Sequence, residues 1–488
     1  MKTKSLKKNY IFNLIYNLTN LMVPLIIAPF LSRILQVDGV GIKSYTFSIV
    51  SNFILFASLG ISEYGQIEIS KNRDNRKNYS RKLYEIGLLR IATTLIVLVV
   101  YIVTLILPIF NNSYNDIYII LIINIIANVI DFSWFLRGIE EFKTITFVQI
   151  ISKIVLLVGT LVFVKTKSDL NLAILINSLT LLVNSILPLF VIKKYCVKVK
   201  IKELRVFSHV KECLVYFVPA IAIQIYTVLD KTMIGLITNS NIENGYYEQA
   251  DKVIKILITV VTTTNAIMNS RISYLYQKKD MNEIKRLINK STCLCMLIAI
   301  PITFGCMAVS SLFVPMFFGD GYDKTINILI ALAPLSIIIG LSGLIGSHYY
   351  TPLGKKAQSN KYLIIGAIVN FVLNMFLIRS LKSTGAAIAS VVAECVITFL
   401  YIAKCNKKLF NFALIFKSSY KYFISAVVMY FVLILIKNHL NCGLVSVAIL
   451  VVVGCFSYGM ILLVLKDKYL YSVLNDLKEK MKNFKKVS

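Results

Sequence analysis

Charged residues are scarce in this sequence, and negatively charged residues are the scarcest of all. Only 16% of its 488 residues are Asp, Glu, Lys or Arg, whereas 57% are hydrophobic, and the mean hydropathy is +0.73. In a soluble globular domain, about a quarter of the residues are charged. The composition therefore excludes an ordinary soluble protein and indicates a protein of the lipid bilayer.

Residues typical of catalytic and metal sites are also few. The chain has three histidines, His209, His348 and His439, and it lacks Asp-x-Asp and Cys-x-x-Cys motifs. Most of its nine cysteines, Cys293 and Cys295 among them, lie inside apolar runs, where cysteine acts as a small hydrophobic residue. We therefore expect no disulfide, no metal site and no cofactor. The sequence gives little support to a membrane-embedded polymerase, glycosyltransferase or acyltransferase, so we do not expect an enzyme.

Long apolar runs recur along the whole chain. Each is about 20 residues long, the length at which a helix crosses roughly 30 Å of hydrocarbon. An outer-membrane barrel would instead have alternating strands of about ten residues. The predicted fold class is therefore an all-α integral membrane protein. Window hydropathy places fourteen spans, at roughly 9–35, 44–69, 83–109, 115–136, 145–165, 170–192, 212–237, 247–270, 290–316, 325–349, 361–378, 384–403, 421–437 and 443–465.

Basic residues are unevenly distributed over the loops. The chain has 53 Lys and Arg against 24 Asp and Glu, a formal net charge of +29 that alone would suit a nucleic-acid-binding protein. However, the basic segments 71–82, 193–211, 271–290, 404–421 and 466–488 alternate with loops that carry few basic residues. By the positive-inside rule, the basic segments are cytoplasmic. This distribution predicts a multi-pass protein of the cytoplasmic membrane, with both termini cytoplasmic and no nucleic-acid partner.

The basic segment near residue 200 divides the spans into two loosely similar groups. Val23-Pro24 and Arg33 in the first span resemble Val218-Pro219 and Lys231 in the seventh. Transporters are often built from two related halves with the binding site between them. The predicted parts are an N-lobe at 1–195, a basic connection at 196–211, a C-lobe at 212–405, two further helices at 406–465 and a basic tail at 466–488.

A polar stripe enters an otherwise apolar stretch between residues 229 and 263. Glu248, Asp251, Lys252 and Lys255 follow one another at i, i+3, i+4 and i+7, and Thr259 continues the row. On a helix these positions share one face. An ionisable side chain near the bilayer centre costs about 2.5–3.5 kcal/mol, so such groups normally face an aqueous cavity or a partner. The stripe predicts a polar cavity inside the helix bundle.

Basic residues near or within several spans are the candidate substrate-binding set of this cavity. They are Arg33, Arg90, Lys153, Lys231, Lys252 and Lys255. Facing one cavity, they would attract an anion, and phosphate oxygens suit Arg and Lys donors. Alternatively, each cation extends to the membrane interface or is held in an ion pair, since Glu248 with Lys252 and Asp251 with Lys255 both have i, i+4 spacing.

Uncharged polar and acidic residues also recur at helical spacing. They can hydrogen-bond neighbouring helices, but their recurrence favours a shared polar cavity. The candidate lining residues are Asn17, Asn20, Asn128, Gln224 and Thr259. Candidates for coupling to protons or sodium are Glu63, Asp131 and Glu394. The single tryptophan, Trp134, is expected to anchor the end of the fourth span at the membrane interface.

Several segments carry a resemblance to a known family. They are APFLSRILQVDGVGIKSYTFSI from Ala28, FASLGISEYGQIEISKNRD from Phe56, DFSWFLRGIEEFK from Asp131, LDKTMIG from Leu229, GYYEQADKVIKIL from Gly245, YYTPLGKKAQSNK from Tyr349 and STGAAIASVVAE from Ser383. In this order they resemble the Wzx-type polysaccharide repeat-unit flippases of the multidrug/oligosaccharidyl-lipid/polysaccharide exporter superfamily. The resemblance covers nearly the whole chain.

The resemblance implies both a fold and a function. The fold is two six-helix lobes plus two C-terminal helices, which alternate between inward-open and outward-open forms. The function is transport of undecaprenyl-diphosphate-linked oligosaccharide repeat units across the cytoplasmic membrane for capsule, O-antigen or other surface polysaccharide. The family's cationic residues match Arg33, Lys231, Lys252 and Lys255, whereas no motif covers Lys153. The implied protein partners are a polymerase and glycosyltransferases of the same pathway.

Two other functions stay open at this point. The first is a proton- or sodium-coupled exporter of drugs or other small molecules in the same superfamily. A cavity dominated by acidic and aromatic residues would favour it, whereas here the cations dominate. The second is a scaffold or receptor without transport activity, which would leave the charges within the spans unexplained.

Overall fold

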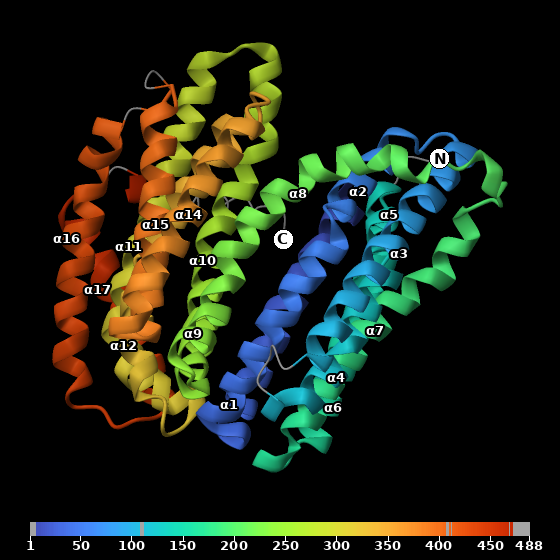
Figure 1. Ribbon diagram of the computed structural model, residues 1–488. Coiled ribbons are helices and arrows are strands. Elements are labelled where there is room, and N and C mark those ends of the chain that lie inside the picture. The colour runs from blue at the N-terminus through green and yellow to red at the C-terminus, as the bar shows by residue number, and fades with distance from the viewer. Residues whose placement is uncertain (1–5, 108–111, 407–408, 411, 468, 472–488) are drawn as a thin grey trace, which may run out of the picture. The chain divides into compact units, whose positions relative to one another are not determined.

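Helices form nearly all of the part of the chain that the structure, a computed structural model, describes (Figure 1). This part comprises residues 6–107, 112–406, 409–410, 412–467 and 469–471, and it leaves out some side chains, including all those of residues 6–18. The predicted all-helical fold is confirmed. The helices are α1 (Leu6–Ser58), α2 (Ile61–Lys71), α3 (Arg76–Ile106), α4 (Asn115–Ile130), α5 (Ser133–Gly138), α6 (Phe142–Phe163), α7 (Leu170–Tyr195), α8 (Val210–Gln224), α9 (Asp230–Thr238), α10 (Asn241–Lys278), α11 (Met281–Phe318), α12 (Asp323–Leu332), α13 (Leu335–Ile345), α14 (Lys356–Leu381), α15 (Ser383–Lys404), α16 (Phe412–Lys437) and α17 (Leu444–Val464).

Twelve helical segments of the described chain are long and apolar enough to cross a membrane, so the count of fourteen stays a prediction. One of the twelve, Met22–Lys71, contains most of the first predicted span and all of the second, because α1 continues past Gln36, whose backbone is not helical (φ 58°, ψ −178°). As one straight helix, these 50 residues would reach about 75 Å, far more than the hydrocarbon thickness. The break at Gln36 instead divides α1 into residues 6–35 and 37–58, each long enough to cross a membrane. The predicted span 247–270 lies in α10, which is not among the twelve.

The chain forms two compact units, Met1–Glu248 and Gln249–Ser488. In the first unit, α1 packs against α3, α4 and α6, and both α4 and α6 pack against α7. In the second unit, α11 packs against α13, α16 and α17, and α14 lies along α15. The boundary between the units falls inside α10. The predicted lobes, which divide at the connection 196–211, stay a prediction.

The short helix α5 is buried, which corrects one expectation. Trp134 is fully buried and packs against α2, where a Cβ atom added to Gly65 would come within 2.5 Å of the indole ring. Phe135 and Leu136 are equally buried in the same apolar cluster. Trp134 is therefore a core residue of the first unit and not an interfacial anchor. A glycine on α2 leaves the room that so large a side chain needs.

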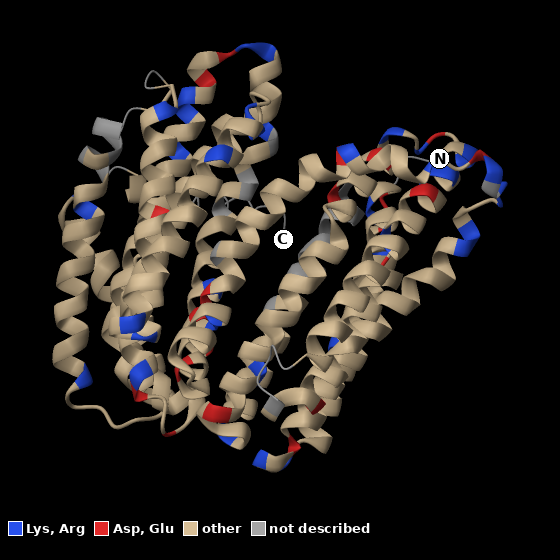
Figure 2. Cartoon of the chain, viewed as in Figure 1, with Lys and Arg blue, Asp and Glu red and all other residues tan. Residues whose placement is uncertain are grey.

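Basic residues gather at one end of the first unit, as Figure 2 shows around the α2–α3 turn and the end of α7. Arg76 donates from Nε to the Tyr195 carbonyl (2.8 Å) and from Nη2 to the Lys194 carbonyl (2.7 Å). The basic segments 71–82 and 193–211 therefore lie side by side, as expected for two loops on the same side of a membrane. That this side is the cytoplasm stays a prediction.

Candidate functional site

The charged stretch that begins at residue 229 forms an ion pair inside the first unit. Lys231 Nζ lies 2.6 Å from Glu248 Oε2, and Ser44 Oγ donates to the same oxygen at 2.8 Å. The Lys231 and Glu248 side chains are only 14% and 16% exposed. Because Lys231 lies on α9, Glu248 on α10 and Ser44 on α1, three helices meet at one carboxylate. The predicted substrate-binding cation Lys231 is thus paired in this structure.

Hydroxyl and amide groups extend this contact along α1 and α9. The Thr232 hydroxyl donates to Ser48 Oγ at 2.9 Å, and Asn52 Nδ2 donates to Thr232 Oγ1 at 3.2 Å. One residue before Glu248 on α10, the Tyr247 hydroxyl donates to Asp230 Oδ2 at 2.6 Å. These helices therefore meet through groups that water can solvate.

Glycines bring the backbone of α1 into contact with the start of α10. A Cβ atom at Gly41 would lie 1.8 Å from the Asn241 carbonyl oxygen, and one at Gly245 would lie 2.1 Å from the Val37 carbonyl oxygen. Real Cβ atoms keep at least 3.0 Å from their neighbours, so a larger residue at either glycine must push the helices apart. We call the contact of Gly41, Ser44 and Ser48 with Thr232, Glu248 and Gly245 the glycine contact.

Arg90 is buried where α4 ends. Its Nε donates to the Asn128 carbonyl (2.6 Å), its Nη2 to Asn128 Oδ1 (2.7 Å) and its Nη1 to Ser62 Oγ (3.2 Å). The Asp131 carboxylate lies 3.8 Å from Nη2, and the arginine side chain is 1% exposed. The last carbonyls of a helix lack partners within it, so the guanidinium satisfies one of them. Arg90 and the candidate lining residue Asn128 are thus bound to each other.

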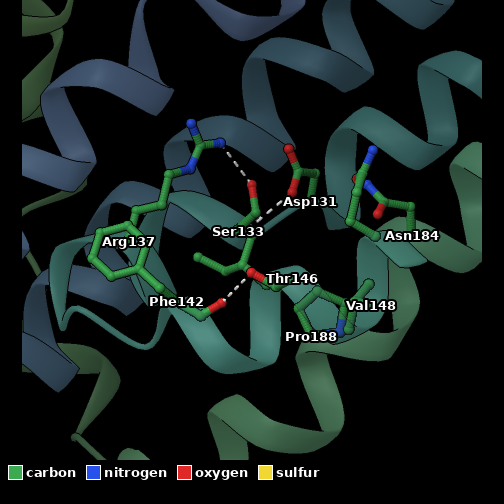
Figure 3. Close-up of a pocket in the computed structure, with 10 residues that line it drawn as sticks. Asp131, Ser133, Arg137, Phe142, Thr146, Val148, Asn184 and Pro188 are labelled. Atoms are coloured by element: carbon green, nitrogen blue, oxygen red, sulfur yellow. Dashed lines mark hydrogen bonds between the residues drawn. The ribbon is translucent and has the colours of Figure 1, made fainter. Parts of the chain in front are cut away.

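A polar cavity of about 330 Å³ lies in the first unit between the α4–α5 junction, α6 and α7 (Figure 3). It contains Asp131, one of the candidate coupling residues. Ser133 ties this junction together, because its N–H donates to Asp131 Oδ1 and its Oγ accepts from Arg137 Nη2, both at 2.9 Å. The cavity is lined by Asp131, Ser133, Arg137, Phe142, Ile145, Thr146, Val148, Gln149, Asn184 and Pro188.

The other candidate residues of the first unit lie apart from the Lys231 pair. Gln149 Nε2 donates to Asn20 Oδ1 and so links α6 to α1. Lys153 lies one turn further along α6, is half-buried, and has no hydrogen bond or ion pair with the described residues. Three more residues stand at helix surfaces or ends. Arg33 is exposed on α1, Glu63 is exposed on α2, and half-buried Gln224 ends α8. The side chain of Asn17 lies outside the described residues.

The remainder of the α10 stripe belongs to the second unit and is partly paired. Lys255 Nζ lies 2.8 Å from Asp251 Oδ2, so this i, i+4 pair, considered from the sequence, is present, although the Lys255 side chain is 50% exposed. Lys252 Nζ lies 3.5 Å from Gln249 Oε1. The Thr259 hydroxyl donates to the Lys255 carbonyl at 2.7 Å, which binds it to its own helix. Lys255 is thus paired with Asp251 and is also accessible to solvent or to a ligand.

Glu394 is a buried carboxyl group on α15. It is 6% exposed and has no hydrogen bond or ion pair among the residues that the structure describes. One turn earlier on α15, Ser390 Oγ accepts from Asn370 Nδ2 at 3.2 Å, and Asn374 Nδ2 donates to Asn370 Oδ1 at 3.1 Å. Burying a charge without a partner is costly, so the site suits a group that gains and loses a proton. Ion coupling through Glu63, Asp131 or Glu394 stays a prediction.

Several polar residues of these contacts, among them Ser44, Gln149 and Asn184, are not in the candidate sets drawn from the sequence. Ser44 begins a serine row at 44, 48 and 51, which was a usable signal. Glu248 was expected in the polar stripe and as a partner of Lys252, but its contact with Lys231 was not expected, because spacing along one helix reveals only partners on that helix. That the six candidate cations share one cavity stays a prediction.

Comparison with known proteins identifies the family of the chain. A sequence model of the family described as "Polysaccharide biosynthesis protein" matches residues 6–268, more than half of the chain. The chain belongs to the polysaccharide biosynthesis protein family. The resemblance inferred from its motifs is thereby confirmed.

Two curated relatives of this family member are transport proteins by name. The putative O-antigen transporter of Escherichia coli (strain K12) is 25% identical over 403 residues, which cover 82% of this chain and 96% of that protein. The probable low-salt glycan biosynthesis flippase of Haloferax volcanii is 27% identical over 177 residues, which cover 36% of this chain and 37% of that protein. These comparisons confirm the prediction of a transporter rather than an enzyme.

Solved structures show the fold of this family member. A lipid II flippase MurJ in an inward closed conformation superimposes with a TM-score of 0.70 at 17% identity, over 93% of this chain and 97% of that chain. An inward-facing multidrug resistance transporter of the MATE family superimposes with a TM-score of 0.57 at 15% identity, over 80% of this chain and 92% of that chain. The chain therefore has the helical multi-pass membrane fold of these transporters.

Proposed function

We propose that this member of the polysaccharide biosynthesis protein family moves undecaprenyl-diphosphate-linked oligosaccharide repeat units across the cytoplasmic membrane, for the assembly of capsule, O-antigen or a related surface polysaccharide. The observation that carries the proposal is the similarity to a putative O-antigen transporter over 96% of that protein's length. Such a substrate has an apolar tail, a diphosphate and several sugars. Each part needs a chemically different binding surface.

An apolar groove in the second unit suits the tail. It has a volume of about 560 Å³ and is lined by residues of α10, α11, α12, α16 and α17, almost all of them apolar. The tail is surrounded by hydrocarbon in the bilayer as well, so the groove offers it a similar apolar surface and does not expose it to water. The tail can therefore stay among hydrocarbon groups while the polar part crosses.

Filling this groove tests the assignment. Gly305 of α11 lines it, and a Cβ atom there would meet nothing nearer than Met429 Cε at 3.8 Å, so a Gly305→Leu side chain can enter the groove without a backbone clash. The leucine side chain should displace about two methylene groups of lipid from contact with the groove wall and weaken binding roughly tenfold, through lost packing contacts. Gly459→Leu is the matched control, because Gly459 has nothing within 4 Å and is not among the lining residues. Equal binding of radiolabelled undecaprenyl diphosphate to both variants would rule out the groove as its site.

Lysines of the α9–α10 stretch suit the diphosphate. Phosphate oxygens form charge-assisted hydrogen bonds with ammonium groups, and each such bond contributes about 1.5–3 kcal/mol. Lys231 already holds a carboxylate, so a phosphate can replace Glu248 as its partner. Lys255 is half-exposed beside Asp251 and can make the same exchange.

Removing two of these cations together should abolish transport. We expect Lys252→Ala with Lys255→Ala to lower the export rate roughly 100-fold or more, because two charge-assisted bonds to the diphosphate are lost. The amount of protein in the membrane should not change. Lys278→Ala, at the exposed end of the same helix, is the control. Surface polysaccharide at the normal level in the double variant would show that these lysines do not bind the substrate.

The glycine contact is proposed as the barrier that opens and closes during transport. Alternating access requires a contact that forms in one state and separates in the other. Three features support this assignment: close backbone packing at Gly41 and Gly245, the Lys231–Glu248 ion pair, and hydroxyl groups that water can solvate. A contact of large apolar side chains would cost more to separate.

Deleting the gene tests the proposed function against the exporter alternative. A flippase predicts loss of surface polysaccharide and accumulation of the lipid-linked repeat unit on the cytoplasmic side. Sensitivity to cationic dyes and drugs should stay unchanged. The opposite pattern, with normal polysaccharide and raised drug sensitivity, would favour the small-molecule exporter.

A further inference from the structure

The polar cavity of the first unit has the composition of a sugar-binding site. Its volume of about 330 Å³ lies at the lower end of the range of about 300–1,000 Å³ for small-molecule sites. Phe142, Ile145, Val148 and Pro188 supply apolar C–H surface, and polar side chains from three helical segments supply the remainder (Figure 3). All lining residues belong to one compact unit.

Several polar groups of the cavity keep unused hydrogen-bonding capacity among the described residues. The Gln149 amide donates to Asn20 but has a carbonyl oxygen to spare, and Asn184 accepts only a long 3.5 Å bond from Ser152, which leaves its amide N–H groups to donate. Asp131 keeps lone pairs beside its bond from Ser133. A hydroxyl group both donates and accepts, so a ligand rich in hydroxyl groups can satisfy all three residues at once.

The charge balance of the cavity separates sugars from the other ligands that this protein could bind. Among the described lining residues, Asp131 is the only carboxylate and Arg137 the only cation, while buried Arg90 lies 3.8 Å behind the carboxylate. Two guanidinium groups beside this carboxylate disfavour a bound sodium ion, since they already offset its charge. The lining itself has no excess of cations over carboxylates, which disfavours a diphosphate. A neutral polyhydroxylated group fits both constraints.

We propose that this cavity, formed by Asp131, Ser133 and Arg137 with Gln149 of α6 and Asn184 of α7, binds a sugar of the lipid-linked substrate and thereby contributes to the choice of glycan. The inference rests on the proposed function and divides the substrate's recognition into two parts. Basic residues hold the diphosphate, which is common to all such lipids. The cavity binds a sugar of the glycan, and the glycan differs from one such lipid to another.

Binding of two lipids tests this division. The probes are lipid-linked glycan purified from cells that lack the protein, and undecaprenyl diphosphate without sugars. We expect Asn184→Ala to weaken binding of the glycosylated lipid roughly tenfold, as for the loss of one or two hydrogen bonds, and to leave binding of the bare lipid unchanged. Asn177→Ala, two turns earlier on the same helix and outside the cavity, should change neither. Arg137→Gln, at an exposed position where misfolding is not expected, should repeat the Asn184 result.

The outcomes separate the two proposals. Equal loss of both lipids in Asn184→Ala and Arg137→Gln, or no loss of either, would overturn the sugar site while leaving the flippase function intact. A change only in the sodium or proton dependence of transport would overturn it as well, in favour of an ion site at Asp131. Failure of the unaltered protein to bind either lipid would instead contradict the proposed function.

Discussion

Oxidation of a protein carrying Ser48→Cys and Thr232→Cys is expected to stop transport completely, and a reducing agent is expected to restore it. The two hydroxyl oxygens are 2.9 Å apart, so two thiols at these positions can form a disulfide with little movement of α1 or α9. The bond would hold the glycine contact closed. A transporter that must separate this contact in every cycle cannot complete a cycle while the bond is intact.

The matched controls are the two single-cysteine variants, which should transport normally with or without oxidant. The nine native cysteines are present in all three proteins, so their oxidation affects each equally. The measurement is the rate at which labelled lipid-linked glycan crosses the membrane of vesicles, before and after oxidation. Full transport by the cross-linked protein would show that the glycine contact is permanent and that the barrier lies elsewhere.

Replacement of Arg90 by methionine is expected to destabilise the first unit severely. The methionine side chain reaches about as far as Arg90 Nε but donates no hydrogen bond. The Asn128 carbonyl and Ser62 therefore lose this donor, Asn128 Oδ1 keeps only its bond from Ser58, and Asp131 loses its positive neighbour. Breaking one side of such a buried network costs about 3–5 kcal/mol. The midpoint temperature of thermal unfolding in detergent should fall clearly.

Two control variants separate the loss of a positive charge from the loss of the guanidinium hydrogen bonds. Lys77→Met removes an exposed cation from the same helix and should leave the unfolding temperature unchanged. Arg90→Lys keeps the charge but not the planar fork, so we expect an intermediate loss. A stable Arg90→Met protein that binds undecaprenyl diphosphate poorly would instead support the sequence-based interpretation of Arg90 as a substrate-binding residue.

The membrane fold could be predicted because its signals are local. Each apolar run of about 20 residues specifies a helix without reference to the rest of the chain. The details that depend on packing against neighbouring helices could not be predicted. Gly39 and Gly41 look like turn residues, yet both lie in α1, and Gly41 serves instead for close approach to α10. Trp134 looks like an interfacial anchor until Gly65 of α2 is seen to make room for it.

The chemistry of the candidate site was predictable in type but not in pairing. Spacing identified Lys231, Lys252 and Lys255 as cations to be explained, and the pair of Lys255 with Asp251 follows from an i, i+4 interval. Glu248, the partner of Lys231, lies on another helix. Ser44 shares this partner and lies 204 positions before Glu248 in the sequence. No pattern within one helix can show such partners. The same holds for Arg90 and Asn128, which come together through packing of α3 on α4.

The most direct test of this account is a transport measurement with purified protein. Undecaprenyl-diphosphate-linked oligosaccharide with a fluorescent sugar is placed in vesicles that contain the protein, and a membrane-impermeant quencher reports how fast the label reaches the opposite leaflet. We predict rapid exposure of the label in vesicles with the unaltered protein and almost none with the Lys252→Ala, Lys255→Ala variant. Exposure no faster than in protein-free vesicles, in a preparation that does transport a cationic dye, would contradict the account.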